Sequence, residues 1–396
     1  MYYLALLLAG CLSLPCWASL TQLTKPELAL MQSLYQQQDR ALSGTELNKH
    51  LLENQFLLAT ARQLNPELLK RQSNVGFDND YHVRRMMVTL LIHQFPALKS
   101  VPKVQLEPPF DAAALSGLLG SYPADGDYQP EQLSHWAQIK LLDTPKVTLA
   151  QLLTSQSMQN RFRLHQGDIG LLTHQLIEWR YHADLTAAAT PLLAQQGLTL
   201  TRLNALATGE LLRPPMLAYL GIKAQLHGER SPYLEALRAN IPGSEIQRYY
   251  QRHRDDFRYQ SQLSALAVTF DSMEEAKQFH KQLGKKGPLP ALKAAKRRNE
   301  FATDEQAALH AITREHTQRW LAQLAFSSKP GKATSPVRTP QGRWAVVYAE
   351  QPQYAYYPQD SETVRYRALE SLTTQHAVAA YQKRFKHWQQ QHGVKL

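Results

Sequence analysis

The spacing of apolar residues predicts a long, mostly helical region from Ser19 to about Ile241. Thr24 and Glu27, three residues apart around a proline, form a capping box that favours a helix start. Further along, apolar residues recur at i, i+3, i+4, i+7 and i+8, which is typical of a helix face buried in a core. This stripe consists of Val83, Met86, Met87, Leu90 and Leu91.

Two stretches interrupt the helical pattern. Residues 95–127 contain five prolines and three glycines with little periodicity, so we expect a loop or an extended crossover there. Pro214 and Pro215 each lack a backbone N–H, which predicts a break before a further helix at 216–227.

Residues 244–350 follow a different order, which is helix, strand, helix-rich middle and then two strands. Capping boxes predict helix starts at Ser244 and at Asp271, and the second helix is expected to end at Gly284. Apolar runs predict strands over 262–270 and 343–349. A proline-containing strand at 334–339 precedes the last one and is expected at the sheet edge.

The chain closes with a Tyr- and Pro-rich segment, 352–358, which is interpreted as a linker, and then a helix from Ser361 to about Gln391. Apolar residues at spacings of three and four residues give this helix one face that must be buried. They are Val378, Tyr381, Phe385 and Trp388. We expect this face to pack on the protein's own helical domain rather than on a coiled-coil partner.

Three pieces of the 244–352 segment carry a family resemblance. They are Glu245–Tyr250 with Phe257, then Leu263–Val268, and finally Phe326–Gly331 followed by Ser335–Thr339 and Gly342. The segment resembles a parvulin-type (PpiC-type) peptidyl-prolyl isomerase domain of the kind found in the periplasmic folding factors SurA and PpiD. The last piece is the most specific of the three.

The chain departs from the family pattern at the positions that carry chemistry. The resemblance places the family's two histidines at Ala265 and Trp344, and the glycine-rich loop has no counterpart in the basic, helix-like interval 287–317. It also implies that Leu321 and Phe326 keep the apolar wall of the pocket. We therefore assign no catalytic residue and take these four residues as candidate peptide-binding positions, with ordinary core packing as the alternative.

Together these features predict an α+β fold with a large, mostly helical N-terminal domain and a small parvulin-like module containing an antiparallel sheet. The C-terminal helix is expected to pack back on the helical domain. The predicted organisation is a signal peptide at 1–18, a helical domain at 19–241, the parvulin-like domain at 244–352, and a linker with the C-terminal helix at 353–396.

The first eighteen residues predict export to the periplasm. An apolar run ends in small residues that suit cleavage after Ala18, whereas Leu8–Cys11 also matches a lipoprotein box that would lipidate Cys11. The chain's two cysteines, Cys11 and Cys16, both lie in this leader, so cleavage leaves a thiol-free protein suited to an oxidising compartment. A buried N-terminal helix is the alternative.

Charge narrows the class of partner. The formal net charge of +11 predicts attraction to acidic partners. An exported protein rarely meets nucleic acid, so we expect no nucleic-acid partner. Acidic client segments or an anionic membrane surface fit better.

The sequence contains no recognisable metal or cofactor site. The fifteen histidines include no H-E-x-x-H signature, and neither a G-x-S-x-G elbow nor a Walker-type loop is present. His174, Glu178 and His182 lie four residues apart along one helix face but span too many turns to hold one ion together. We therefore expect no metal and no cofactor.

Three functions remain open on this reading. The first is a periplasmic chaperone or assembly factor that binds extended client polypeptides, with isomerase activity weak or lost. The second is an active parvulin-type prolyl isomerase with an unrecognised arrangement of residues. The third is a basic scaffold protein of the cell envelope.

Overall fold

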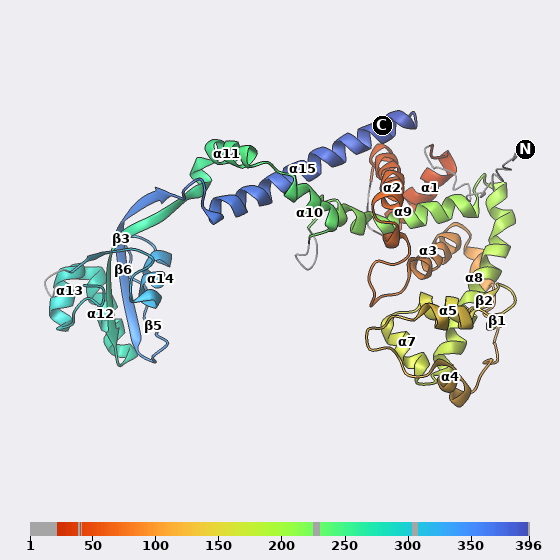
Figure 1. Ribbon diagram of the computed structural model, residues 1–396, viewed down its shortest axis with the longest axis horizontal. Helices are drawn as coiled ribbons and strands as arrows, with labels where there is room; N and C mark the ends of the chain where they lie inside the picture. The colour runs from red at the N-terminus through yellow and green to blue at the C-terminus, as the bar shows by residue number, and fades with distance from the viewer. Residues whose placement is uncertain (1–21, 39, 41, 225–229, 303–307, 395–396) are drawn as a thin grey trace, which may run out of the picture. The chain divides into compact units, whose positions relative to one another are not determined.

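The computed structural model describes residues 22–38, 40, 42–224, 230–302 and 308–394 (Figure 1). The chain falls into two compact units. The helical unit comprises the described residues up to Ala239 together with those from Thr374 onward, and the sheet unit comprises Asn240–Thr373. The leader with Cys11, Cys16 and the cleavage position lies outside the described residues. Among the described helices, none is both long enough and apolar enough to cross a membrane.

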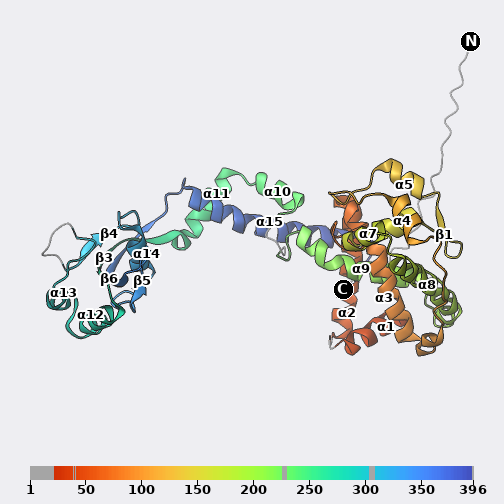
Figure 2. The same ribbon diagram turned by 90° about the horizontal axis from the view of Figure 1, so that it is seen from below.

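The helical unit is built almost entirely from helices (Figures 1 and 2). In chain order its elements are α1 (Lys25–Gln37), α2 (Gly44–Leu64), η1 (Pro66–Leu69), α3 (Asn79–Gln94), η2 (Pro96–Ser100), α4 (Ala112–Leu119), α5 (Pro130–Trp136), β1 (Lys140–Leu142), β2 (Val147–Thr148), α6 (Leu149–Ser155), α7 (Met158–His165), α8 (Ile169–Gln195), α9 (Leu200–Tyr219) and α10 (Pro232–Ala239). The last helix, α15 (Glu362–Gln391), contributes its second half to this unit. The predicted helical region is thereby confirmed.

The capping box at Thr24 is confirmed. Its hydroxyl accepts from the Glu27 N–H, and the Glu27 carboxylate accepts from the Thr24 N–H at 2.7 Å. The predicted loop at 95–127 is wrong in part, because it contains η2 and α4. The Asp111 carboxylate caps α4 by accepting from the Ala114 N–H at 2.7 Å, so a short helix forms despite the surrounding prolines.

The predicted break at Pro214 and Pro215 is also wrong, since α9 runs through both residues. Pro215 leaves the Leu211 carbonyl without its helical donor, and the side-chain amide of Gln72 supplies a hydrogen bond to that oxygen at 3.3 Å. On either side of the prolines, Leu212 and Met216 are fully buried in the core. Tertiary packing therefore outweighs the local helix-breaking tendency.

Asp78 makes the stability of the helical unit depend on pH. Its Oδ1 accepts from the Tyr81 N–H at 2.7 Å and caps α3. Burial nevertheless raises the pKa of Asp78 to about 6, although this hydrogen bond favours the charged form. The pKa of an unfolded aspartate is about 3.9, so between these values the folded state binds more protons than the unfolded chain, and stability falls as pH rises.

We predict that Asp78→Asn removes this dependence, because asparagine caps a helix about as well as aspartate but does not titrate. Urea unfolding at several pH values should show the wild-type protein losing stability relative to the variant as pH rises from about 4 to about 6. Parallel pH profiles for the two proteins would contradict the raised pKa.

The second half of α15 packs on α2 within the helical unit, as expected from its apolar face. Phe56 of α2 lies against three aromatic rings of α15, with ring centroids 5.0–6.1 Å apart. These rings belong to Tyr381, Phe385 and Trp388. Val378, which shares the predicted stripe, is instead 39% exposed.

The sheet unit contains one four-stranded antiparallel sheet with strand order β4-β3-β6-β5. Its elements are α11 (Gly243–Arg252), η3 (Arg254–Phe257), β3 (Arg258–Phe270), α12 (Met273–Lys286), α13 (Pro288–Ala295), β4 (His310–Ile312), α14 (Arg319–Ser327), β5 (Val337–Arg338), β6 (Trp344–Tyr356) and the first half of α15. Figure 1 shows α12 and α13 on one side of this sheet and α14 on the other. The predicted α+β fold is confirmed.

Several boundaries in the sheet unit differ from the predictions. The helix predicted to start with a capping box at Ser244 is α11, which begins at Gly243 without a side-chain cap. The box predicted at Asp271 lies one residue later, where Ser272 pairs with Glu275. The helix that follows continues past Gly284 to Lys286, and Gly287 forms its C-cap with a φ of 81° that suits glycine.

The Tyr- and Pro-rich segment predicted as a linker is largely strand, because β6 continues through Pro352 to Tyr356. The register between β3 and β6 shifts between Gln262 and Ser264, and Pro352 lies opposite this irregularity. Gln351 there adopts a positive φ of 53°. A proline that supplies no ladder hydrogen bond is tolerated at such a bulge.

Candidate functional site

The two faces of the four-stranded sheet are covered by different helices. Alternate residues of the central strands β3 and β6 point to opposite faces. On one face, small and branched side chains pack under α14, and we call this layer the α14 face. Its buried members are Leu263, Ala265, Ala267, Phe301, Ile312, Leu321, Ala322, Ala325, Phe326, Ala345, Val347 and Ala349.

Three of the four candidate peptide-binding residues meet in the α14 face. Ala265 has no exposed surface, and Leu321 and Phe326 are each 6% exposed. Trp344 lies elsewhere, since Ala265 pairs with Ala349 whereas Trp344 pairs with Phe270. That register puts Trp344 on the opposite face, against the layer formed with α12 and α13. The four residues therefore do not line one common pocket.

The interval 287–317, predicted as a basic helix, instead supplies parts of the α14 face. Of its described residues, the helical ones lie near its start, in α13, and β4 follows later. Between them, the buried Asn299 ties the segment to β3: its Oδ1 accepts from the Ala267 N–H at 3.0 Å, and its Nδ2 donates to the Ala265 carbonyl at 2.9 Å. This anchoring places Phe301 in the apolar layer.

Sequence reasoning missed two histidines near this layer. His310 of β4 pairs directly with Ala265 in the antiparallel register, so both residues share the α14 face. The ring of His316 lies edge-on to Phe301, with centroids 5.2 Å apart. Both positions lie outside the motif pieces that carry the resemblance, and only the non-local pairing of β4 with β3 reveals them.

The rim of the α14 face is cationic and half-exposed. The Arg314 guanidinium lies 4.6 Å from the centre of the Phe326 ring, and its own residue is exposed to solvent. Trp320 and Leu324 of α14 are partly buried beside the layer.

Within the described residues, no group of histidine, cysteine, aspartate and glutamate side chains is arranged to hold a metal ion. His174 and Glu178, on α8, are 3.9 Å apart, and Glu178 also pairs with Lys103. His174 and Glu178 are exposed, as expected for a solvated polar stripe, but His182, the third residue of that stripe, has its Nε2 buried.

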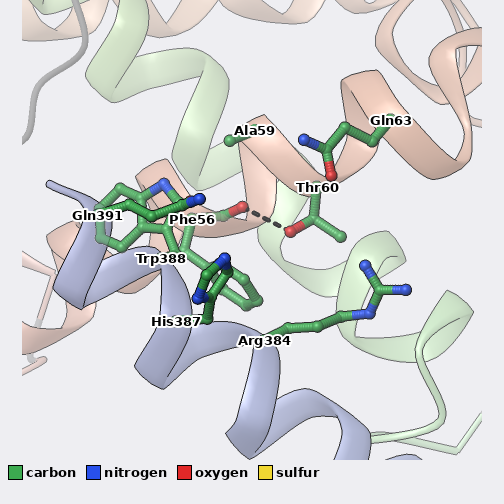
Figure 3. Close-up of a pocket in the computed structure, with 8 residues that line it drawn as sticks. All are labelled: Phe56, Ala59, Thr60, Gln63, Arg384, His387, Trp388 and Gln391. Atoms are coloured by element: carbon green, nitrogen blue, oxygen red, sulfur yellow. Dashed lines mark hydrogen bonds between the residues drawn. The ribbon is translucent and has the colours of Figure 1, made fainter.

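A hollow of about 250 Å³ lies between α2 and the end of α15 (Figure 3). Phe56 and Trp388 form its apolar part, and the Thr60 hydroxyl donates to the Phe56 carbonyl at 2.8 Å. Its polar residues Arg384 and His387 are exposed to solvent. None of the residues that line this hollow is both buried and chemically reactive.

Solved structures with a local likeness to the chain include the foldase protein PrsA from Streptococcus pneumoniae strain Canada MDR_19A, at 13% identity and a TM-score of 0.22 over 52% of this chain and 70% of that one. PrsA from Bacillus anthracis gives 13% identity and a TM-score of 0.22 over 53% and 83%. A structure from a study of PEB4 and Cj1289, two SurA-like chaperones of Campylobacter jejuni, gives 16% identity and a TM-score of 0.23 over 70% and 98%. Scores this low define no common overall arrangement.

No curated protein matches the chain. A family model does match, and it covers the sheet unit almost entirely: residues 241–365 fit the PPIC-type PPIase domain. The match spans the lead-in helix α11, all four strands of the sheet and the start of α15. The chain therefore carries a domain of the PPIC-type, or parvulin-type, peptidyl-prolyl isomerase family at residues 241–365.

Proposed function

We propose that the protein is a periplasmic chaperone or assembly factor that binds extended client polypeptides and has weak or no prolyl isomerase activity. One observation carries this proposal. The two residues at which the resemblance places the family's histidines, Ala265 and Trp344, lie on opposite faces of the sheet. A prolyl bond isomerises over a barrier of roughly 20 kcal/mol, and in this proposal Ala265 and Trp344 supply no imidazole that would help to lower it.

Client binding in this proposal uses the rim of the α14 face. Arg314 swings away from Phe326, and an apolar client side chain takes its place between Phe326 and Trp320. Contacts of this kind are apolar and non-directional, so binding is broad and weak. The net charge of +11 favours clients, or membrane surfaces, that carry negative charge.

A protease-coupled assay with a proline-containing peptide tests the loss of isomerase activity. With the full chain we predict a cis-to-trans rate equal to the uncatalysed rate, together with suppressed aggregation of an unfolded client in a light-scattering assay. Phe326→Ala should weaken the suppression, whereas Phe162→Ala, at a 51% exposed position of the helical unit, should leave it unchanged. A clearly catalysed rate would overturn the proposal.

The pairing of His310 with Ala265 favours a second candidate, an active isomerase that draws an imidazole from β4 instead of β3. If the chain does catalyse isomerisation, the rates of His310→Ala and His316→Ala test whether an imidazole from this part of the chain takes part. Under the second candidate His310→Ala abolishes the rate, whereas a rate that survives both substitutions would exclude it.

The periplasmic location rests on the leader sequence and is part of the proposal. Amino-terminal sequencing of the protein recovered from periplasmic extract should begin at Ser19. Recovery of the protein in the membrane fraction with a lipidated Cys11 would contradict cleavage after Ala18. A basic scaffold protein, the third function considered, would bind acidic surfaces in a salt-sensitive way and show no preference for unfolded polypeptide.

A further inference from the structure

A groove of about 360 Å³ lies between α3 and α8 of the helical unit. The two helices lie side by side (Figure 2). The residues that line the groove recur at helical spacing along one face of α3 and along one face of α8. The lining residues are Tyr81, Arg84, Arg85 and Val88 on α3, and His174, Gln175, Glu178, Trp179 and His182 on α8.

Two polar atoms in the α8 wall of this groove have no hydrogen-bond partner among the residues that the structure describes. They are the indole Nε1 of Trp179 and the Nε2 of His182, both buried from solvent. A buried polar group without a partner costs about 1–3 kcal/mol of folding free energy. These two atoms therefore leave hydrogen bonds that a ligand in the groove would form. Burial, helped by the nearby Arg84 charge, lowers the pKa of His182 to about 4, which keeps its imidazole neutral near pH 7.

The facing wall, on α3, carries a cation to which no carboxylate among the described residues is bound. The Arg84 guanidinium lies 3.8 Å from the centre of the Trp179 ring, and among the described residues it forms no ion pair within 4 Å. Asp78 and Asp80 are near enough to act on its charge, but burial is the larger influence and lowers the pKa of Arg84. Arg85, at the exposed edge, adds a second positive charge.

One carboxylate, Glu178, also lines the groove and opposes anion binding. Its Oε1 is engaged by Lys103 in an ion pair, and His174 lies 3.9 Å from the same oxygen. Lys103 thus offsets part of that negative charge. The net charge of the residues that line the groove is positive, and their hydrogen-bond donors cluster around Trp179.

We propose that the groove between α3 and α8 binds a carboxylate attached to an apolar or aromatic body. The carboxylate accepts two hydrogen bonds from the Arg84 guanidinium and one each from Trp179 Nε1 and His182 Nε2, the latter in the tautomer with its proton on Nε2. A planar two-oxygen acceptor suits the fork of an arginine. The long Arg84 side chain moves off the indole to admit the ligand, and Tyr81 and Val88 contact its apolar part.

The carboxylate could come from the C-terminus of a polypeptide or from an acidic side chain next to an apolar residue. Both present the same chemistry to the groove. The proposal does not depend on the isomerase-family domain, because every residue involved belongs to the helical unit.

The test uses the full chain labelled with ¹⁵N at its indole groups, with Trp179→Phe assigning the Trp179 resonance. N-acetylphenylalanine, which has a free carboxylate, is titrated against N-acetylphenylalaninamide, its neutral counterpart, and against inorganic phosphate. We expect the Trp179 resonance to move with the acid only. Equal response to the amide, equal affinity for phosphate, or no response to the acid would each overturn the proposal.

Variants then locate the contact. Arg84→Met keeps the stem over the indole but removes the charged donors, and should weaken binding of the acid by roughly 10- to 100-fold. Lys99→Met removes one exposed positive charge outside the groove and should leave the affinity unchanged. The other indole resonances report whether the Arg84→Met variant is folded. Calorimetry on Trp179→Phe measures the affinity for the acid a second time, and we expect it to be weaker than that of the wild-type protein. Unchanged affinity in both groove variants would refute the site.

Two peptides separate the sources of the carboxylate. One ends in phenylalanine with a free C-terminus, and the other is amidated and contains an internal Glu-Phe pair. Stronger binding of the first assigns a chain terminus, and stronger binding of the second assigns an acidic side chain. Binding of neither peptide, alongside binding of the small acid, would overturn a polypeptide as the ligand.

Discussion

Replacing Arg213 by alanine is expected to destabilise the helical unit by about 3 kcal/mol, the lower end of the range for breaking a buried ion pair. Arg213 of α9 pairs with Glu53 of α2, and their side chains are only 20% and 16% exposed. Its Nη1 also donates to Asn54 at 3.0 Å. Without the guanidinium, the Tyr381 hydroxyl is the one donor to Glu53 left among the described residues, and the carboxylate remains a poorly solvated charge.

The loss is enlarged because the pair belongs to a network that joins α2 to α9. Asn54 donates to Glu210 at 2.6 Å, and the Glu210 carboxylate also accepts from His50 at 2.9 Å. Although burial acts to raise the pKa of Glu210, these hydrogen bonds outweigh it and hold that pKa below the usual value. Deleting Arg213 therefore disturbs two carboxylates at once.

Urea unfolding of the full chain measures the effect, and Arg163→Ala provides the matched control. Arg163 pairs with Asp168 at 2.6 Å, but its side chain is 52% exposed, so its removal should cost less than about 1 kcal/mol. Similar losses for the two variants would show that the α2–α9 network contributes no more than a surface ion pair.

Local sequence patterns predicted the existence of most elements in the sheet unit, because they depend on neighbouring residues alone. The alternation over Trp344–Ala349 correctly indicated a strand with two faces. The capping signals predicted the starts of α11 and α12 to within two residues, although α11 has no side-chain cap. Family resemblance in short motif pieces then sufficed to indicate the fold.

The arrangement of the site could not be predicted in the same way, because it depends on pairing between distant segments. Which face of β6 meets α14 is fixed by its register with β3, and that register turns Trp344 away from Ala265. His310 reaches the α14 face only because β4 pairs with β3 across 45 residues of chain. The tolerance of Pro352 likewise depends on a bulge whose partner strand lies far away in sequence.

At Pro214 and Pro215 the local prediction was wrong for a different reason. Proline does disfavour a helix, but tertiary packing outweighs that tendency here. Proline disfavours the interior of a helix by about 3 kcal/mol. Burial of Leu212 and Met216 is worth a comparable amount, about 1.5–3 kcal/mol for each side chain. A hydrogen bond from Gln72 to the Leu211 carbonyl removes part of the remaining cost.

Replacing Phe56 by alanine should destabilise the helical unit by about 3–5 kcal/mol, as expected for deletion of a buried aromatic ring. Phe56 is 2% exposed and is surrounded by Tyr381, Phe385 and Trp388 from the second half of α15. Its removal leaves a cavity between α2 and α15 that these large rings cannot easily fill. The prediction thus tests whether the C-terminal helix is an integral part of the helical core.

Phe162→Ala is the matched control, since the same ring is 51% exposed there and its loss should cost about 1 kcal/mol or less. A double-mutant cycle of Phe56→Ala with Trp388→Ala should give a coupling of about 0.5–1.5 kcal/mol, the range for an aromatic pair. Additive losses would mean that the two rings do not touch in solution. An effect of Phe56→Ala no larger than that of Phe162→Ala would mean that α15 is not packed on α2, and the hydrophobic stripe of the last helix would then require another partner.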